Sequence, residues 1–108
     1  MRPLYHPPIQ DVTVEGILHA LSDPVRMDMF VALTRISDVM NCSTLMNSCG
    51  ATLPKSTLSQ HFKILREAGL IRSERKGVEL QNHSRMAELK KTFGPMISAI
   101  LKAYEKKI

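Results

Sequence analysis

The hydrophobic pattern of this chain of 108 residues changes its period immediately after Gly69. Before that glycine, apolar residues recur three or four positions apart, which is typical of amphipathic helices. From Leu70 to Leu80 apolar and polar residues alternate on both sides of Arg75-Lys76-Gly77, which predicts a two-stranded hairpin with a basic tip. Helical spacing returns from Ser84 to Lys107. The fold class we expect is therefore mainly α with a small β-hairpin.

The helical part of the chain divides at its prolines and glycines. Residues 1–11 hold three prolines and predict an extended N-terminal arm, so that one domain covers residues 12–108. Asp23 is placed to cap a helix that begins at Pro24, and Gly69 is a natural stop for the fourth helix. Pro95 predicts a kink or a break in the last helix. The four helices expected before the hairpin run from Val12 to Leu21, Pro24 to Arg35, Asp38 to Asn47 and Lys55 to Ala68.

Composition excludes several classes of protein. The two cysteines are too few for a disulfide-rich secreted scaffold. No stretch approaches the roughly 18–20 continuous apolar residues of a membrane span, and residues 1–8 lack the apolar core of a signal peptide. No glycine-rich phosphate loop, paired-carboxylate signature or supported Cys–His arrangement is present in the sequence. We therefore expect a small cytoplasmic protein that is not an enzyme, uses no cofactor and has no membrane partner.

The positive charge is concentrated in one part of the chain. The formal net charge is +5, yet residues 1–53 are slightly acidic, with three basic and five acidic residues. Residues 54–77 hold six basic residues against two acidic ones. A basic cluster inside an ordered segment indicates a polyanionic partner. A solvated face that aids solubility is the alternative interpretation.

The segment from Lys55 to Ala68 predicts a helix with two unlike faces. One face carries Leu58, Phe62, Leu65 and Ala68, whereas the opposite face is polar. An α-helix fits the major groove of DNA, where short polar side chains can both donate to and accept from base edges while cations bind phosphates. We therefore expect double-stranded DNA as the partner. The residues expected to contact bases or phosphates are Thr57, Ser59, Gln60 and His61; those expected to contact phosphates are Lys55, Ser56, Lys63, Arg72, Arg75 and Lys76.

Two of these assignments have structural alternatives. Ser56 or Thr57 is also a suitable helix cap. His61 lies at the border of the two faces and is also suited to a hydrogen bond at the edge of the core.

Two stretches resemble a known family. Leu-Ser-Asp-Pro-Val-Arg at Leu21–Arg26 resembles the "L-x-D-P-x-R" signature of ArsR-type winged helix-turn-helix repressors, and residues 56–71 resemble that family's recognition helix, "T-V-S-x-H-L-x-x-L-x-x-A-G-L-V". The resemblance covers most of residues 12–105. It implies a homodimer, built from the first and last helices, that binds a pseudo-palindromic operator and usually represses. A winged-helix module that binds protein rather than DNA is the alternative, although the polar helix face and the basic hairpin tip argue against it.

The dimer is also favoured by the amount of apolar surface on the terminal helices, because a short chain has few places to bury it. The last helix packing only on its own domain is the alternative. The residues expected in the dimer interface are Ile17, Leu18, Leu89, Phe93, Ile97, Ile100 and Leu101.

The resemblance also raises the question of an effector. The family's thiolate sensors carry a Cys-x-Cys pair where this chain has Met40, Asn41 and Cys42. The family's other common metal site uses Asp, His and Glu side chains on the last helix, where this chain has only His83, at the start. No standard metal site is therefore expected. Cys42 and Cys49 are seven residues apart, about 10.5 Å along a continuous helix, which is too far for a disulfide unless the chain turns between them. Inert thiols, redox or thiol-reactive sensing, and a non-standard soft-metal site completed by another subunit or His6 all remain open. The effector itself is not defined by the sequence.

Overall fold

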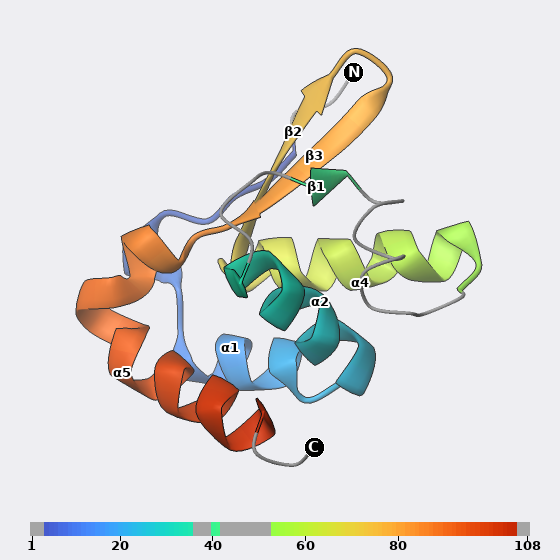
Figure 1. Ribbon diagram of the computed structural model, residues 1–108. Helices are drawn as coiled ribbons and strands as arrows, with labels where there is room; N and C mark the ends of the chain where they lie inside the picture. The colour runs from blue at the N-terminus through green and yellow to red at the C-terminus, as the bar shows by residue number, and fades with distance from the viewer. Residues whose placement is uncertain (1–3, 36–39, 42–52, 106–108) are drawn as a thin grey trace.

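A computed structural model describes residues 4–35, 40–41 and 53–105. The chain forms a helical body from which one β-hairpin projects (Figure 1). We call this hairpin, built from β2 and β3, the wing. The helices are α1 (Val14–Leu21), α2 (Pro24–Arg35), α4 (Lys55–Glu67) and α5 (Met86–Glu105), and the strands are β1 (Met40–Asn41), β2 (Ile71–Lys76) and β3 (Glu79–Ser84). A single 3₁₀ turn, Ile9–Asp11, follows the extended residues of the N-terminal arm.

Side-chain caps begin the first two helices. The Thr13 hydroxyl accepts a hydrogen bond from the Gly16 amide at 3.0 Å, which starts α1. Oδ1 of Asp23 accepts from the amides of Val25 at 2.8 Å and Arg26 at 3.2 Å, so the capping role predicted for Asp23 is confirmed. Burial acts to raise the pKa of Asp23, but the two amide hydrogen bonds outweigh it and hold the pKa below its ordinary value.

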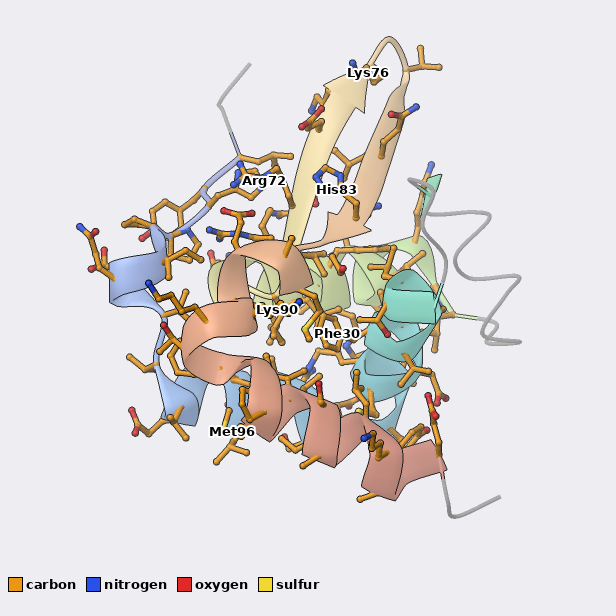
Figure 2. The ribbon with its side chains drawn as sticks, turned by 60° about the vertical axis from the view of Figure 1, so that its left-hand side comes forward. Phe30, Arg72, Lys76, His83, Lys90 and Met96 are labelled. Carbon is orange, nitrogen blue, oxygen red and sulfur yellow. The ribbon has the colours of Figure 1, made fainter. Side chains whose placement is uncertain are left out.

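The core lies where the four helices meet the base of the wing. Figure 2 shows Phe30 in the middle of the helical body. Every helix contributes to this core, and the start of β2 closes it on the side of the wing. The largest fully buried side chains are Phe30, Phe62, Ile17, Met29, Leu65, Leu70, Ile71, Leu89, Ile97 and Asn82.

Gly69 ends α4 as expected. The Leu70 amide donates to the Leu65 carbonyl at 3.1 Å and the Gly69 amide to the Arg66 carbonyl at 3.1 Å, which is the hydrogen-bond pattern of a Schellman motif. Gly69 has φ +89°, and a Cβ atom at this position would lie 2.5 Å from Cγ2 of Val12. Both the backbone conformation and the close approach of Val12 therefore require glycine.

The predicted hairpin is present as the wing, and its register places Ile71 opposite Ser84 and Lys76 opposite Glu79. Only Gly77 and Val78 connect the strands. Gly77 has φ +63° and Val78 does not have a positive φ, which is the pattern of a type II′ turn. This turn matches the twist of antiparallel strands and sets the register of the wing.

The sheet has three strands rather than the expected two, in the order β1-β3-β2. Met40 pairs with Asn82 and Asn41 with Gln81. The helix predicted over Asp38–Asn47 is therefore wrong at Met40–Asn41, because pairing with the edge of β3 satisfies the backbone there and overrides local helical spacing. The rest of that predicted helix lies outside the described residues.

The last helix, α5, is a single element of 20 residues that continues through Pro95. Of the kink or break predicted at Pro95, the break therefore does not occur. The Tyr104 hydroxyl donates to the carboxylate of Asp28, which fastens the end of α5 to α2. In the part of the chain that the structure describes, no helix is both long and apolar enough to cross a membrane.

Candidate nucleic-acid interface

A groove of about 310 Å³ runs between α4 and the wing. We call it the α4–wing groove. Its walls come from three separate parts of the sequence: the N-terminal arm, one face of α4 and one face of the wing. The described residues that line it are Leu4, Ser56, Ser59, Gln60, Phe62, Lys63, Arg66, Arg75 and Leu80.

Strand alternation decides which wing residues face this groove. Side chains two apart in β2 share a face, and Ile71 and Ser73 are buried against the body. Arg75 continues that face into the groove, opposite Leu80 on β3. Lys76 points to the other face of β2, and Figure 2 shows it at the far end of the wing. Arg75 and Lys76 are thus presented in different directions.

The groove is strongly basic. Lys63 and Arg66, three residues apart on α4, face Arg75 across it, and no carboxylate is among its described lining residues. The Arg66 guanidinium also donates to the Ser73 hydroxyl at 3.3 Å, which joins α4 to β2. Three cations beside the hydroxyls of Ser56 and Ser59 make a site suited to a polyanion.

The first turn of α4 is open to solvent. Its N-cap residue is Pro54, and no side chain caps the helix, so neither Ser56 nor Thr57 has the capping role that was the alternative for them. Lys55 and Thr57 are exposed beside the groove without lining it. The uncapped amide groups of a helix N-terminus favour an anion, which adds to the positive potential of the groove.

His61 does not face the groove. Its Nδ1 lies 3.2 Å from Nη1 of the nearly buried Arg26. Because arginine can only donate, Nδ1 of His61 is the acceptor, and a neutral ring then carries its hydrogen on Nε2. This contact is the structural role that was the alternative for His61, although the half-buried ring keeps an edge near the surface.

Arg72 is directed away from the groove. Nη2 of Arg72 donates to both carboxylate oxygens of Glu88, at 3.2 and 3.3 Å, and Arg85 binds the same carboxylate. The pKa of Glu88 is lowered, mainly by its hydrogen bonds from Arg85 and then by the charge of Arg85 and the contacts with Arg72. Burial of Glu88 acts in the opposite direction. Figure 2 shows Arg72 at the base of the wing, far from Lys76. Arg72 is therefore paired with a carboxylate of α5.

The structure therefore brings five of the ten predicted contact residues into one groove: Ser56, Ser59, Gln60, Lys63 and Arg75. Four more residues that were not predicted as contacts line the groove: Leu4, Phe62, Arg66 and Leu80. Val78, at the tip of the wing, was not predicted as a contact either. Arg66 could have been found from its helical spacing to Lys63, and Val78 from its place in the turn beside two cations. Val78 is fully exposed at the tip of the wing. Nothing in the sequence pointed to Leu4.

The residues expected in a dimer interface differ in accessibility. Ile17, Leu89 and Ile97 are completely buried in the core of their own chain and Phe93 is nearly so, which leaves them no surface to offer a partner. Leu18 is 49% exposed. Ile100 and Leu101 are half-buried. A second hollow of about 560 Å³ lies along α5 and is lined by Met86, Ala87, Lys90, Gly94, Pro95 and Ser98.

The candidate sensing residues, Cys42 and Cys49, lie outside the described residues. Within the described ranges, no group of three or more His, Cys, Asp or Glu side chains is arranged to hold a metal ion. His6, which the soft-metal alternative invoked, accepts a hydrogen bond from the Ser73 amide.

The helices and the wing together define a winged helix-turn-helix fold. A sequence profile described as a helix-turn-helix domain matches residues 21–74, half of the chain. The chain belongs to this family of helix-turn-helix domains. No curated protein sequence matches it closely enough to be a relative.

Several solved structures share this fold, and some of them are described as ArsR-type regulators. The transcriptional repressor BigR from Xylella fastidiosa is 23% identical with a TM-score of 0.61, over 80% of this chain and 84% of BigR. An ArsR-like transcriptional regulator from Rhodococcus sp. RHA1 is 23% identical with a TM-score of 0.60, over 87% and 82% of the two chains. The homodimeric winged helix-turn-helix DNA-binding domain of Mb0332 from Mycobacterium bovis, a possible ArsR-family regulator, is 16% identical with a TM-score of 0.64, over 88% and 83%.

Proposed function

We propose that this protein is a homodimeric, sequence-specific DNA-binding regulator that acts in the cytoplasm and represses transcription from a pseudo-palindromic operator. The observation that carries the proposal is the α4–wing groove. There Lys63, Arg66 and Arg75 surround a space bordered by Ser59 and Gln60, with no carboxylate among the described lining residues. Cations beside short polar side chains are what DNA recognition requires, because the cations fix the register and the polar groups read bases.

In this proposal α4 enters the major groove. Gln60 and Ser59 face the base edges, since a glutamine can bind adenine through both a donor and an acceptor. Lys63 and Arg75 bind the phosphates of the strand that passes between α4 and the wing. Lys55, Ser56 and Thr57 hold a phosphate at the start of α4.

The tip of the wing supplies a second contact. Lys76 and the exposed Val78 reach the adjacent minor groove, where cations and apolar side chains are both used. This contact extends the protein along the duplex beyond the reach of α4.

A second copy of the chain completes the site. The exposed Leu18 of α1 and the half-buried Ile100 and Leu101 of α5 form the contact in this proposal. The homodimeric state of the similar Mb0332 domain supports it. Two copies related by a twofold axis place their recognition helices about one DNA turn apart, roughly 34–36 Å, which matches a pseudo-palindromic operator.

The repressor role rests on the likeness to BigR, which is described as a transcriptional repressor. In this proposal a dimer bound to an operator next to its own gene excludes RNA polymerase. Release of the protein from the operator then requires a signal. Oxidation of Cys42 and Cys49 is the release step that we propose for test. A single titration of operator by reduced and by peroxide-treated protein, repeated with Cys42→Ser and Cys49→Ser, decides it. Identical curves for the reduced and peroxide-treated forms of all three proteins would show that the thiols are inert.

DNA binding is tested with the promoter fragment of the protein's own gene and a scrambled duplex of equal length and composition. We expect a mobility shift for the promoter fragment at low salt that the scrambled duplex does not compete away. Lys63→Ala should weaken the shift strongly, whereas Lys102→Ala, an exposed cation at the far end of α5, should not. Equal binding to both duplexes, or no binding at low salt, would contradict the proposal.

A further inference from the structure

The N-terminal arm is fastened to the base of the wing by two hydrogen bonds. The Ser73 amide donates to Nε2 of His6 at 3.0 Å, and Nη1 of Arg85 donates to the Pro7 carbonyl at 2.8 Å. Arg85 is 3% exposed and Pro7 is buried. Since β2 is an edge strand, the amide of Ser73 points away from the sheet, and His6 takes the place of a neighbouring strand.

Ser73 is the residue at which the arm, the wing and α4 meet. Its hydroxyl donates to Oδ1 of Asn82 on β3 at 2.7 Å and accepts from Nη1 of Arg66 on α4 at 3.3 Å. Its amide binds His6. Two residues before His6, Leu4 lines the α4–wing groove. The hydrogen bond from Ser73 to His6 thus fixes one wall of the groove in which we expect DNA to bind.

This hydrogen bond requires a neutral imidazole. Nε2 of His6 must be unprotonated to accept from the Ser73 amide, while the ring also bonds the backbone of Leu4. A neutral histidine has one acceptor and one donor nitrogen, so both are used. A second proton would place a donor against the Ser73 amide and break the contact.

The charges that face His6 oppose that proton. Among the described residues, Arg72 of β2, Arg66 of α4 and Arg85 before α5 lie around the ring, and the carboxylate of Glu88 from α5 is already bound by Arg72 and Arg85. Burial first, and then these three arginines, hold the pKa of His6 below its ordinary value. The arm is therefore fully attached above the ordinary histidine pKa of about 6.5 and is released as the pH falls through the lowered pKa of His6.

We propose that His6 is a positioning residue for the DNA-binding surface: its neutral ring ties the N-terminal arm to Ser73, holds Leu4 in the wall of the α4–wing groove, and releases both when it is protonated. The inference rests on the proposed function, because the groove is where the DNA backbone is expected. It adds to that function a third structural element, the arm, beside α4 and the wing. It also gives operator binding a dependence on pH that comes from one identified side chain.

The attachment of the arm is tested without DNA by NMR from pH 8 to pH 5. We expect the Ser73 amide and the Leu4 methyl signals to shift together with the ring signals of His6, at a midpoint below about 6.5. In His6→Gln the side-chain oxygen occupies nearly the position of Nε2 and accepts without titrating, so these shifts should disappear. A His6 ring that titrates while the Ser73 amide and Leu4 stay unchanged would overturn the proposal.

The effect on DNA is tested with operator affinities at pH 7.5 and at a pH below the midpoint found by NMR, at constant salt. Because a change of pH also acts on other groups, the comparison is between variants, with the exposed His19→Gln as control. We expect wild type and His19→Gln to lose about 3–10-fold in affinity at the lower pH relative to His6→Gln, which is the contribution of about one net hydrogen bond. His6→Ala should be weakened at both pH values.

DNA binding and the attachment of the arm are distinguished by different results. A wild-type protein that binds no operator at pH 7.5 would contradict the proposed function, while the NMR titration would still report on the arm. If operator affinity were the same for wild type, His6→Gln and His6→Ala at both pH values, DNA binding would stand and the role of His6 would be overturned.

Discussion

Arg26 and His61 lie 3.2 Å apart, Nη1 to Nδ1, and join the start of α2 to α4. The same guanidinium donates to the carbonyls of Ala20 at 2.7 Å and His19 at 3.3 Å, at the end of α1. One nearly buried side chain therefore connects three helices. The two sequence stretches that resemble ArsR-type repressors meet at this contact, which gives a physical reason for both to be present.

Replacing Arg26 by methionine should lower the free energy of unfolding by about 2–4 kcal/mol. The change leaves two carbonyl groups and Nδ1 of His61 without their donor, and a buried polar group that loses its partner is costly. Urea denaturation of the variant measures the loss. Arg75→Met removes an exposed arginine and should change stability by no more than about 0.5 kcal/mol. Equal stability of the two variants would show that the contacts of Arg26 do not hold the helices together.

Gly69 and Gly77 both have positive φ but differ in the space around them. A Cβ at Gly69 would lie 2.5 Å from Val12, whereas a Cβ at Gly77 would meet nothing within 4 Å. Alanine at Gly77 should cost about 1 kcal/mol for the backbone conformation alone, and alanine at Gly69 should cost about 1–3 kcal/mol more. Thermal unfolding of both variants measures the difference. Val12→Ala should recover part of the extra loss in the Gly69→Ala background, and no recovery would mean that the close approach is not its cause.

Local rules predicted most of the fold. The helical periods around Phe30, Phe62 and Ile97, the cap at Asp23 and the stop at Gly69 are all present in the sequence and in the structure. These features depend on residues within about four positions of one another, so the chain specifies them locally.

The features that the sequence did not predict depend on contacts between segments that are distant in the chain. The strand at Met40–Asn41 exists because β3 pairs with it, and no local spacing records such a partner. The same holds for Leu4, which reaches the groove through the bond from Ser73 to His6, 67 positions apart. Within the site, helical spacing predicted Ser59, Gln60 and Lys63. It could not show that Arg72 binds Glu88 instead of facing the groove.

The proposed dimer interface predicts that Leu18→Glu yields monomers. A carboxylate on the exposed part of α1 would be buried without a partner if two copies met there. Sedimentation velocity measures the change in mass. Val78→Glu places the same charge on a fully exposed apolar residue at the tip of the wing and should leave the dimer intact. A dimeric Leu18→Glu, or a wild-type protein that is monomeric at micromolar concentration, would contradict the interface.

Acid should destabilise the protein in part through Glu88. Its pKa is lowered in the folded state by Arg85 and Arg72, so its contribution is present above the unfolded value and is lost as the pH falls below about 4.5. Glu88→Gln should be less stable than wild type at neutral pH, and the difference should shrink towards pH 3. Urea midpoints at a series of pH values measure it. A difference that stays constant with pH would mean that the ionised carboxylate has no role in stability.

Gln60 and Lys63 should have different effects on DNA binding. Gln60→Ala removes a side chain that we expect to read bases, so it should relax the sequence preference, with about 1–3 kcal/mol less discrimination at one base pair of each half-site. Lys63→Ala should weaken binding to all sequences about equally. Affinities for a panel of singly substituted operators separate the two effects. A uniform loss in both variants would remove Gln60 from base reading.

The salt dependence of operator affinity is the most direct test of DNA binding at the α4–wing groove, because it reports how many phosphates the basic groove neutralises. A dimer that touches about 6–10 phosphates should lose about 10³–10⁵ in affinity between 50 and 200 mM salt. Lys63→Ala combined with Arg75→Ala removes two groove cations from each of two protomers and should reduce the slope of log affinity against log salt by about 3–4, whereas Lys102→Ala should leave it unchanged. A slope that is the same in wild type and in the double variant would contradict the assignment of the α4–wing groove as the DNA-binding site.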